Sequence, residues 1–250
     1  MRLTKHLLIL MLFASSSLFA VEEQSTENNL VAVANSNRLL QYYENGENKG
    51  PSIEILQAVL KEAQLDATVK FMPWVRAFST AKNNPNTLIF SMIRTPEREA
   101  DFHWIIQVSN LSRVFISLAS KPENYVDTMQ QAKHKLIATI VDSASYNELI
   151  SHGFSEQENL YRVPDWEVMV TLFESGKVDL IYAEPNSIKH ILERRGKESV
   201  TLRYKAIESK KELTSYIAIN KSTDIEIVKR LQQAARKFEK TAEYNRLLFE

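Results

Sequence analysis

The sequence predicts an α/β protein of two lobes, because strand-like and helix-like segments alternate along the chain and the alternation occurs twice. The first set lies within residues 30–99 and the second within residues 135–207. Parallel strands need a crossover between them, usually a helix, so this order favours parallel pairing. Extended apolar segments at 112–122 and 212–220 follow the two sets, and neither has the composition of a flexible Gly/Ser linker. We therefore expect two ordered crossings between the lobes.

The first set alternates three strands with three helices. In order, the elements are a strand at 30–35, a helix at 52–64, a strand at 67–72, a short helix at 74–82, a strand at 87–92 and a helix that opens at 95. The first helix gathers apolar residues on one face: Ile55, Leu56, Val59, Leu60 and Ala63. The last helix begins in TPERE, where Thr95 is the expected cap and Pro96 presets the first turn.

The second set repeats the pattern, and a helical tail follows it. Strands are expected at 135–141, 159–163, 177–183 and 200–207, and helices at 145–153, 165–176 and 184–196. Asp165 is the predicted N-cap of the middle helix, which Gly176 ends. Residues 223–250 predict one long amphipathic helix and a shorter one. If this tail packs on the first unit, residues 21–115 and 212–250 form lobe 1 and residues 116–211 form lobe 2, with a ligand cleft between them.

Residues 1–20 have the features of a secretory signal peptide. Arg2 and Lys5 are followed by an apolar stretch from Leu7 to Phe13, and Ala20 stands at a plausible cleavage point. The apolar run is short for a membrane span, although an uncleaved amphipathic anchor is the alternative. We therefore expect an exported protein, most simply a periplasmic one.

Composition argues against several functional classes. Removal of residues 1–20 takes away two of the 31 basic residues, so 29 basic and 31 acidic side chains remain, a net charge of −2. That balance gives no electrostatic reason to bind nucleic acid or an anionic membrane surface. The absence of cysteine excludes disulfides, thiolate metal sites and a cysteine nucleophile. The five glycines form no phosphate loop, the histidines have no metal-ligand spacing, and no G-x-S-x-G elbow occurs. We expect a monomer without metal or cofactor.

Four stretches carry a resemblance to a known family: VKFMPWVRAF, FSMIRTPEREADFHWI, SGKVDLIYAEPNSI and the helical tail. Together, in this order and over essentially the whole chain after residue 20, they resemble the periplasmic solute-binding proteins of the amino-acid-binding family (family 3), which are the receptor subunits of ABC importers. The T-x-E-R run followed by a short aromatic stretch is the most specific element. The resemblance implies a type II periplasmic-binding-protein clamshell, in which two α/β lobes close on a ligand about two crossover strands.

The resemblance also implies a ligand site. Arg98 has the place of the family arginine that binds the ligand's α-carboxylate, and a guanidinium offers a carboxylate a rigid, matching donor fork. Ser143 has the hydroxyl position of a loop that completes this grip, with Asp142 where glycine is usual, unless Ser143 is only a helix cap. Glu184 stands where the family often has an aspartate for the ligand's ammonium, or else it is a helix N-terminal charge favoured by the dipole.

Further positions match cleft-lining regions of the family: Asn35, Tyr43, Trp74, Arg76 and Ser91. Asn35 replaces a second ammonium-binding aspartate, so one of two negative charges is absent. Each of these residues is otherwise a packing residue. The arginines at 38, 76 and 98 all lie near predicted strand ends, which predicts a ligand with at least one carboxylate and leaves open a second anionic group.

The expected function is binding of a small carboxylate-bearing solute, an amino acid or a related polar compound, for ABC-type uptake by lobe closure. Two alternatives stay open. A stand-alone sensor would present the same closed state to a membrane receptor. An enzyme on the same fold, similar to the periplasmic cyclohexadienyl dehydratases, would use Glu184 as a general acid or base beside an arginine-held carboxylate.

Overall fold

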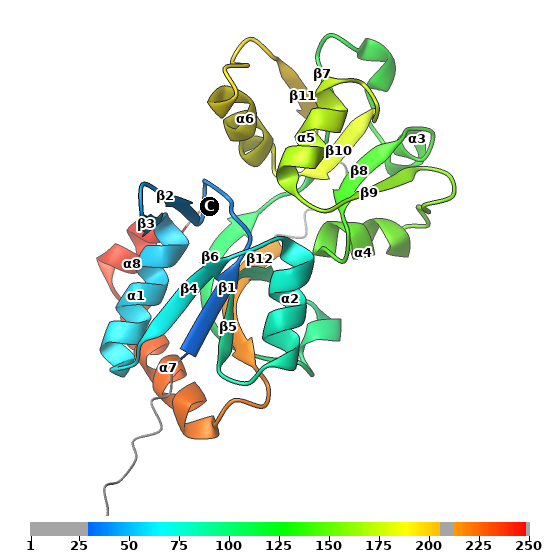
Figure 1. Cartoon of the computed structure of the whole chain (residues 1–250). Helices are drawn as coiled ribbons and strands as arrows, with labels where there is room; N and C mark the ends of the chain where they lie inside the picture. Colours follow the sequence, from blue (N-terminus) through cyan, green and yellow to red (C-terminus); the bar gives the residue numbers. More distant parts are fainter. Residues whose placement is uncertain (1–29, 206–212, 249–250) are drawn as a thin grey trace, which may run out of the picture.

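The computed structural model describes residues 30–205 and 213–248, which form two lobes around two five-stranded sheets (Figure 1). The strand order is β4-β1-β5-β12-β6 in the first sheet and β11-β7-β10-β8-β9 in the second. The chain crosses from β6 (Phe102–Leu111) to β7 (Val114–Leu118) and returns to the first sheet with β12 (Leu213–Asn220). The predicted α/β class with two lobes is confirmed. The predicted signal peptide at 1–20 and residues 206–212 of the second crossing lie outside the described residues.

The first lobe is a largely parallel sheet with helices on both faces. β1 (Leu30–Ala34) pairs in parallel with β4 (Ala67–Phe71) and β5 (Thr87–Ile93), while β12 runs antiparallel between β5 and β6. α1 (Pro51–Ala63), α7 (Ile225–Phe238) and α8 (Ala242–Leu247) cover one face, and α2 (Trp74–Asn83) covers the other (Figure 1). β1 is apolar throughout, and β5 is apolar except for Thr87 and Ser91, because both faces of the sheet are covered. The helical tail packs on α1, as predicted.

The second lobe has the same plan. β8 (Ile137–Ile140) pairs in parallel with β9 (Leu160–Val163) and β10 (Leu180–Ala183), and β7 runs antiparallel between β10 and β11 (Leu202–Lys205). The helices are α3 (Met129–Ala132), α4 (Ala144–Ser151), α5 (Trp166–Glu174) and α6 (Pro185–Arg194). Asp165 caps α5 by accepting a hydrogen bond from the Val168 amide, as predicted. No helix within the described ranges combines the length and apolarity that a bilayer span needs.

Some elements differ from the sequence prediction. The expected helix at TPERE is a single 3-10 turn, η1 (Pro96–Arg98), and the Thr95 side chain makes no capping bond. The chain leaves this turn at once because β6, ten residues long, pairs along its whole length with β12. A second 3-10 turn, η2 (Pro122–Asn124), and a hairpin of β2 (Tyr42–Glu44) and β3 (Glu47–Lys49) were not predicted.

The boundary between the lobes also differs from the sequence prediction. The sequence pattern placed residues up to 115 in lobe 1, but Val114 and Phe115 already belong to β7 of the second sheet. The crossing between β6 and β7 is therefore only residues 112–113. The polar pair Ser112 and Arg113 marks it within an otherwise apolar stretch.

Candidate functional site

Two adjoining cavities lie between the lobes. The outer cavity has a volume of about 400 Å³ and the inner one about 120 Å³. Both are lined by residues of the first lobe and of the second, and they share Asn35, Asn37, Trp74, Ile140, Trp166 and Ser187. A ligand that fills either cavity therefore contacts both lobes.

The cavities lie at the carboxyl ends of the central strands. Asn35 follows the end of β1, and Ile93 ends β5, in the first lobe. Ile140 ends β8 and Glu184 follows the end of β10, in the second lobe. Ligands of open α/β sheets bind outside the carboxyl ends of their strands, so the topology of both sheets directs polar side chains to this place.

Arg98 projects from η1 into the inner cavity and is 4% exposed. One terminal nitrogen donates to the carbonyl of Ile93 at 2.9 Å, and the other lies 3.5 Å from the carbonyl of Asp142 in the second lobe. Its guanidinium carbon lies 5.4 Å from the ring centre of Trp74 and 5.0 Å from that of Phe78. Within residues 30–205 and 213–248, no acidic side chain forms an ion pair with Arg98.

The position of Arg98 is costly for a cation. Burial, and after it the nearby charge of Arg113, lower the pKa of Arg98 to about 10, while the charge of Glu97 acts against this shift. The group remains protonated at neutral pH. A buried guanidinium that keeps its charge without an ion-pair partner favours the approach of an anion.

Arg113, which the sequence prediction missed, is a second arginine of the inner cavity. It lies in the two-residue crossing, and its side chain is 9% exposed. It forms an ion pair with Glu148 at 2.7 Å and donates to the Ser145 hydroxyl at 2.8 Å. Its Nε has no hydrogen-bond partner among the described residues. Burial lowers the pKa of Arg113, and the charge of Glu148 acts against that shift.

Ser143 and Glu184 both line the inner cavity, and both cap a helix of the second lobe. The Ser143 hydroxyl accepts a hydrogen bond from the Tyr146 amide at 3.1 Å. The two carboxylate oxygens of Glu184 accept from the amides of Asn186, at 2.9 Å, and Ser187, at 2.7 Å. The capping roles weighed for these residues are therefore present in the structure.

Asp142 has a positive φ of 55°, which explains why glycine suits this position. Its side chain lines neither cavity and the residue is exposed. The backbone carbonyl of Asp142 accepts from the indole of Trp74 at 3.2 Å as well as from Arg98. Asp142 thus contributes an acceptor to the contact between the lobes, and its carboxylate points elsewhere.

A buried amide holds the strand ends of the first lobe together. Gln41, 1% exposed, accepts from the Ser91 hydroxyl at 2.6 Å and donates to the carbonyl of Asn35 at 3.1 Å. Ser91 has a positive φ of 47° and lines the inner cavity with Gln41. Gly50 packs directly against the backbone of Leu40, the residue before Gln41. A Cβ on Gly50 would lie 2.5 Å from the carbonyl oxygen of Leu40, so this packing requires glycine. Gln41 was not predicted, since its place depends on this packing.

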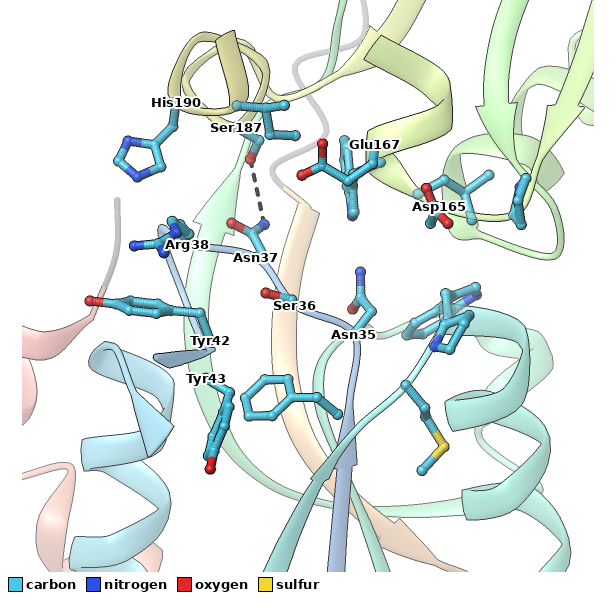
Figure 2. A pocket seen from close by; sticks show the side chains of 18 of the residues that line it. Asn35, Ser36, Asn37, Arg38, Tyr42, Tyr43, Asp165, Glu167, Ser187 and His190 are labelled. Carbon is cyan, nitrogen blue, oxygen red and sulfur yellow. Dashed lines mark hydrogen bonds between the residues drawn. The ribbon is translucent and has the colours of Figure 1, made fainter. Parts of the chain in front are cut away.

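The outer cavity is lined by charged and aromatic side chains (Figure 2). On the first lobe, Arg38 pairs with Glu44 at 2.6 Å and lies over the ring of Tyr42. On the second lobe, Glu167 forms ion pairs with Arg194 and Arg195. A hydrogen bond of 3.5 Å joins Asn37 to the Ser187 hydroxyl across the gap, as the dashed line in Figure 2 shows.

The remaining predicted site residues fall in different places. Asn35 and Trp74 line both cavities, and Tyr43 lines the outer one with 59% of its surface exposed. Arg76 lies exposed on α2 and is not part of either lining. Its helix presents Trp74 and Phe78 to Arg98, and Arg76 lies on another face. Among the residues described, no cluster of side chains has the composition of a metal site.

Comparison with known proteins places this geometry in context. The model of the bacterial extracellular solute-binding proteins, family 3, matches residues 30–248. None of the curated proteins matches the sequence at a significant level. Among solved structures, a histidine kinase sensor domain with similarity to periplasmic binding proteins has a TM-score of 0.76 at 14% sequence identity, over 88% of this chain and 93% of that chain.

Two solved binding proteins have the same fold. An ancestral arginine-binding protein bound to arginine has a TM-score of 0.74 at 14% identity, over 88% of this chain and 96% of that chain. The amino acid ABC transporter substrate-binding protein AbpA of Streptococcus pneumoniae, bound to L-arginine, has a TM-score of 0.72 at 18% identity, over 88% of this chain and 92% of that chain. At these identities the likeness shows a shared fold, the type II clamshell with two sheets.

Proposed function

The chain belongs to family 3 of the bacterial extracellular solute-binding proteins, and from this premise we propose that it captures a small carboxylate-bearing solute between its lobes for ABC-type uptake. The observation that carries the proposal is the guanidinium of Arg98, which is buried at a cavity lined by both lobes and has no acidic partner among the described residues. A periplasmic location, reached through the signal peptide at 1–20, is part of the proposal.

The mechanism is capture followed by closure. With the lobes apart, a carboxylate binds Arg98, whose fork of donors suits its two oxygens. The amino ends of α4 and α6 then approach from the second lobe, because Ser143, Ala144, Glu184 and Ser187 line the same cavity. Backbone amides at helix starts favour negative charge. The ligand stabilises the closed state by the difference between its affinities for the closed and open states.

The geometry favours binding over catalysis. An acid or base on this fold would have to be Glu184, the one acidic residue among the described residues of the inner lining. Both of its oxygens already accept backbone hydrogen bonds. A carboxylate held in this way is fixed by the helix start and is poorly placed to exchange protons with a substrate.

A thermal-shift screen tests the proposal. The purified protein is melted with amino acids and with mono-, di- and tricarboxylates, each in large excess. A ligand at one hundred times its Kd stabilises the protein by about 2.7 kcal/mol, which raises the Tm by about 5–10 °C for a chain of this size. The same screen on Arg98→Met is expected to show no shift.

The matched control for Arg98→Met is Arg94→Met. Arg94 lies four residues earlier, pairs with Glu99 at 2.7 Å and lines neither cavity, so its loss should leave the ligand shift in place. The proposed function would be contradicted if no compound in the panel changed the Tm, or if Arg98→Met kept the Tm shift of the unmodified protein. Uptake is separated from sensing by measuring whether deletion of the gene abolishes accumulation of the radiolabelled ligand.

A further inference from the structure

Building on the proposed function, we propose that the site is selective for organic acids that carry no α-ammonium group, and that Arg113 provides a second guanidinium for their anionic or acceptor oxygens. The ligand class is therefore short dicarboxylates and related acids, and not α-amino acids. The charges around the inner cavity carry this inference.

An α-ammonium group needs an acidic partner close to Arg98. It is bonded to the carbon next to the carboxylate, so a carboxylate on Arg98 places the ammonium in the same small cavity. A charged ammonium that loses water without a counter-charge is strongly disfavoured. Among the described residues of the inner lining, Glu184 is the one acidic side chain.

Glu184 is already engaged. It is 8% exposed, and each of its oxygens accepts a short hydrogen bond from an amide in the first turn of α6. The positive end of the helix dipole balances its charge. An ammonium would have to compete with both amides, which have no alternative partner in that turn.

The other acidic groups near the site form no ion pair with Arg98 among the described residues. Glu97 precedes Arg98 in the chain and its charge opposes the fall in the pKa of Arg98, but Glu97 is exposed and lines neither cavity. Glu148 pairs with Arg113 and accepts from the Tyr182 hydroxyl at 3.1 Å. Asp142 lines neither cavity. Asp165 and Glu167 line only the outer cavity, where Asp165 caps α5 and Glu167 pairs with two arginines.

Both guanidiniums that line the inner cavity can donate further hydrogen bonds. Arg98 has no acidic partner in the described part of the chain, and Arg113 keeps a buried Nε–H without a partner there. A buried donor without a hydrogen-bond partner costs free energy. A ligand oxygen that accepts from Arg113 removes this cost and therefore binds more favourably than an oxygen that stays in contact with water. A second carboxylate, or a keto or hydroxyl oxygen, meets this requirement. Arg113 is paired with Glu148, so Arg98 is the cation of the inner lining that has no ion-pair partner in the described part of the chain. One such cation beside one capped carboxylate favours an anion over a zwitterion.

Matched pairs of ligands test the inference by calorimetry on the full protein. The pairs are succinate with L-aspartate, glutarate with L-glutamate, and pyruvate with L-alanine; the members of the first two pairs differ only in the amino group. We expect the acid without the amino group to bind at least about 10-fold more tightly in at least one pair, with no pair reversed. If no acid shows this preference, or if any amino acid binds more tightly than its partner, the inference is overturned and the proposed function stands. No binding by any member would overturn both.

Two variants identify the residues responsible. Arg113→Lys keeps the charge but loses the Nε–H and the planar fork, and we expect it to weaken succinate binding at least about 10-fold. Arg203→Lys is the control, because Arg203 is exposed, stacks on Tyr125 and lines neither cavity. The unliganded Tm of each variant shows whether it is folded.

Besides Arg113→Lys, the other test variant is Glu184→Gln, which removes the negative charge from the inner lining. We expect it to raise succinate affinity a few-fold by lowering the repulsion of the anion. If Glu184 instead receives a ligand ammonium, the variant will weaken L-aspartate binding at least about 10-fold, and that result would overturn the inference. The measurement on Glu184→Gln still tests the inference if Arg113→Lys does not fold.

Discussion

Binding and stability make opposite demands on the residue Arg98. Its burial lowers its pKa, which means that the folded protein disfavours the very charge that a carboxylate requires. Two backbone carbonyls and two aromatic rings hold the guanidinium in place but do not neutralise it. In the proposed function, an anionic ligand supplies the missing stabilisation.

A substitution separates these two demands. Arg98→Met removes the buried charge and keeps a flexible apolar chain between Trp74 and Phe78, while the Ile93 carbonyl loses its donor. The relief of desolvation and the lost hydrogen bonds are similar in size. We expect the free energy of unfolding without ligand to change by less than about 1 kcal/mol. Urea unfolding measures it, and a loss above about 3 kcal/mol would show that Arg98 is mainly structural.

Some candidate site residues could be found from the sequence and others could not. Arg98, Ser143 and Glu184 stand at positions that match motifs of the family the sequence resembles, and the structure brings all three to the inner cavity. Arg113 and Gln41 reach the same cavity only through the crossing and a turn held by tertiary contacts. A local pattern carries no information about such contacts. The exposed Arg76 shows the converse, since proximity to a strand end does not fix the face on which a helical residue lies.

At the scale of elements, the junctions after two strands carry unusual backbone conformations. Ser91, near the end of β5, and Asp142, between β8 and α4, are non-glycine residues with positive φ. Such conformations cost energy and persist where the surrounding structure imposes them, which is common at ligand sites. Here they aim a hydroxyl and a carbonyl, respectively, toward Gln41 and toward Trp74.

Replacing Asp142 tests this strain. Asp142→Gly should keep the carbonyl acceptor, remove an exposed carboxylate and raise the free energy of unfolding by up to about 1 kcal/mol. Asp142→Ala is the matched control, because it removes the same carboxylate but retains a Cβ at positive φ, and it should lower stability. Urea unfolding of the two variants measures the difference. Equal stabilities would show that the backbone at Asp142 is not strained.

Most elements could be predicted, but those defined by distant partners could not. α1, α5 and α7 have clear apolar faces, and the buried runs of β1, β5, β8 and β10 are short and bounded by polar residues. The length of β6 depends on β12, which follows it only after the whole second lobe. Pairing with β12 overrides the local helix signal of TPERE, so η1 stops after one turn.

At the scale of the whole molecule, the described contacts between the lobes surround the cavities. The Trp74 indole and Arg98 donate from the first lobe to the Asp142 carbonyl of the second, and Asn37 donates to Ser187. An apolar cluster that includes Trp74 and Ile140 continues from one lobe to the other. Under the proposed mechanism, closure and ligand binding use the same small set of side chains, and weakening a contact between the lobes should weaken ligand binding.

Trp74→Phe tests this coupling. The substitution removes the indole N–H that donates to Asp142 at 3.2 Å and keeps an aromatic ring beside Arg98. A neutral hydrogen bond contributes about 0.5–1.5 kcal/mol, and under the proposed mechanism this bond between the lobes forms only on closure. The free energy of closure should rise by that amount, so the affinity for the acid found in the thermal screen should fall about 2- to 10-fold.

Trp104→Phe is the matched control for Trp74→Phe. Trp104 packs against Phe102 and Tyr216 within the first lobe and lines neither cavity, so its replacement should leave the affinity unchanged. Calorimetry measures the affinities, and small-angle X-ray scattering measures whether saturating ligand reduces the radius of gyration. If the bond to Asp142 forms only on closure, Trp74→Phe needs more ligand to reach the compact form but reaches the same final radius. Equal effects of the two substitutions would show that ligand binding does not depend on this contact between the lobes.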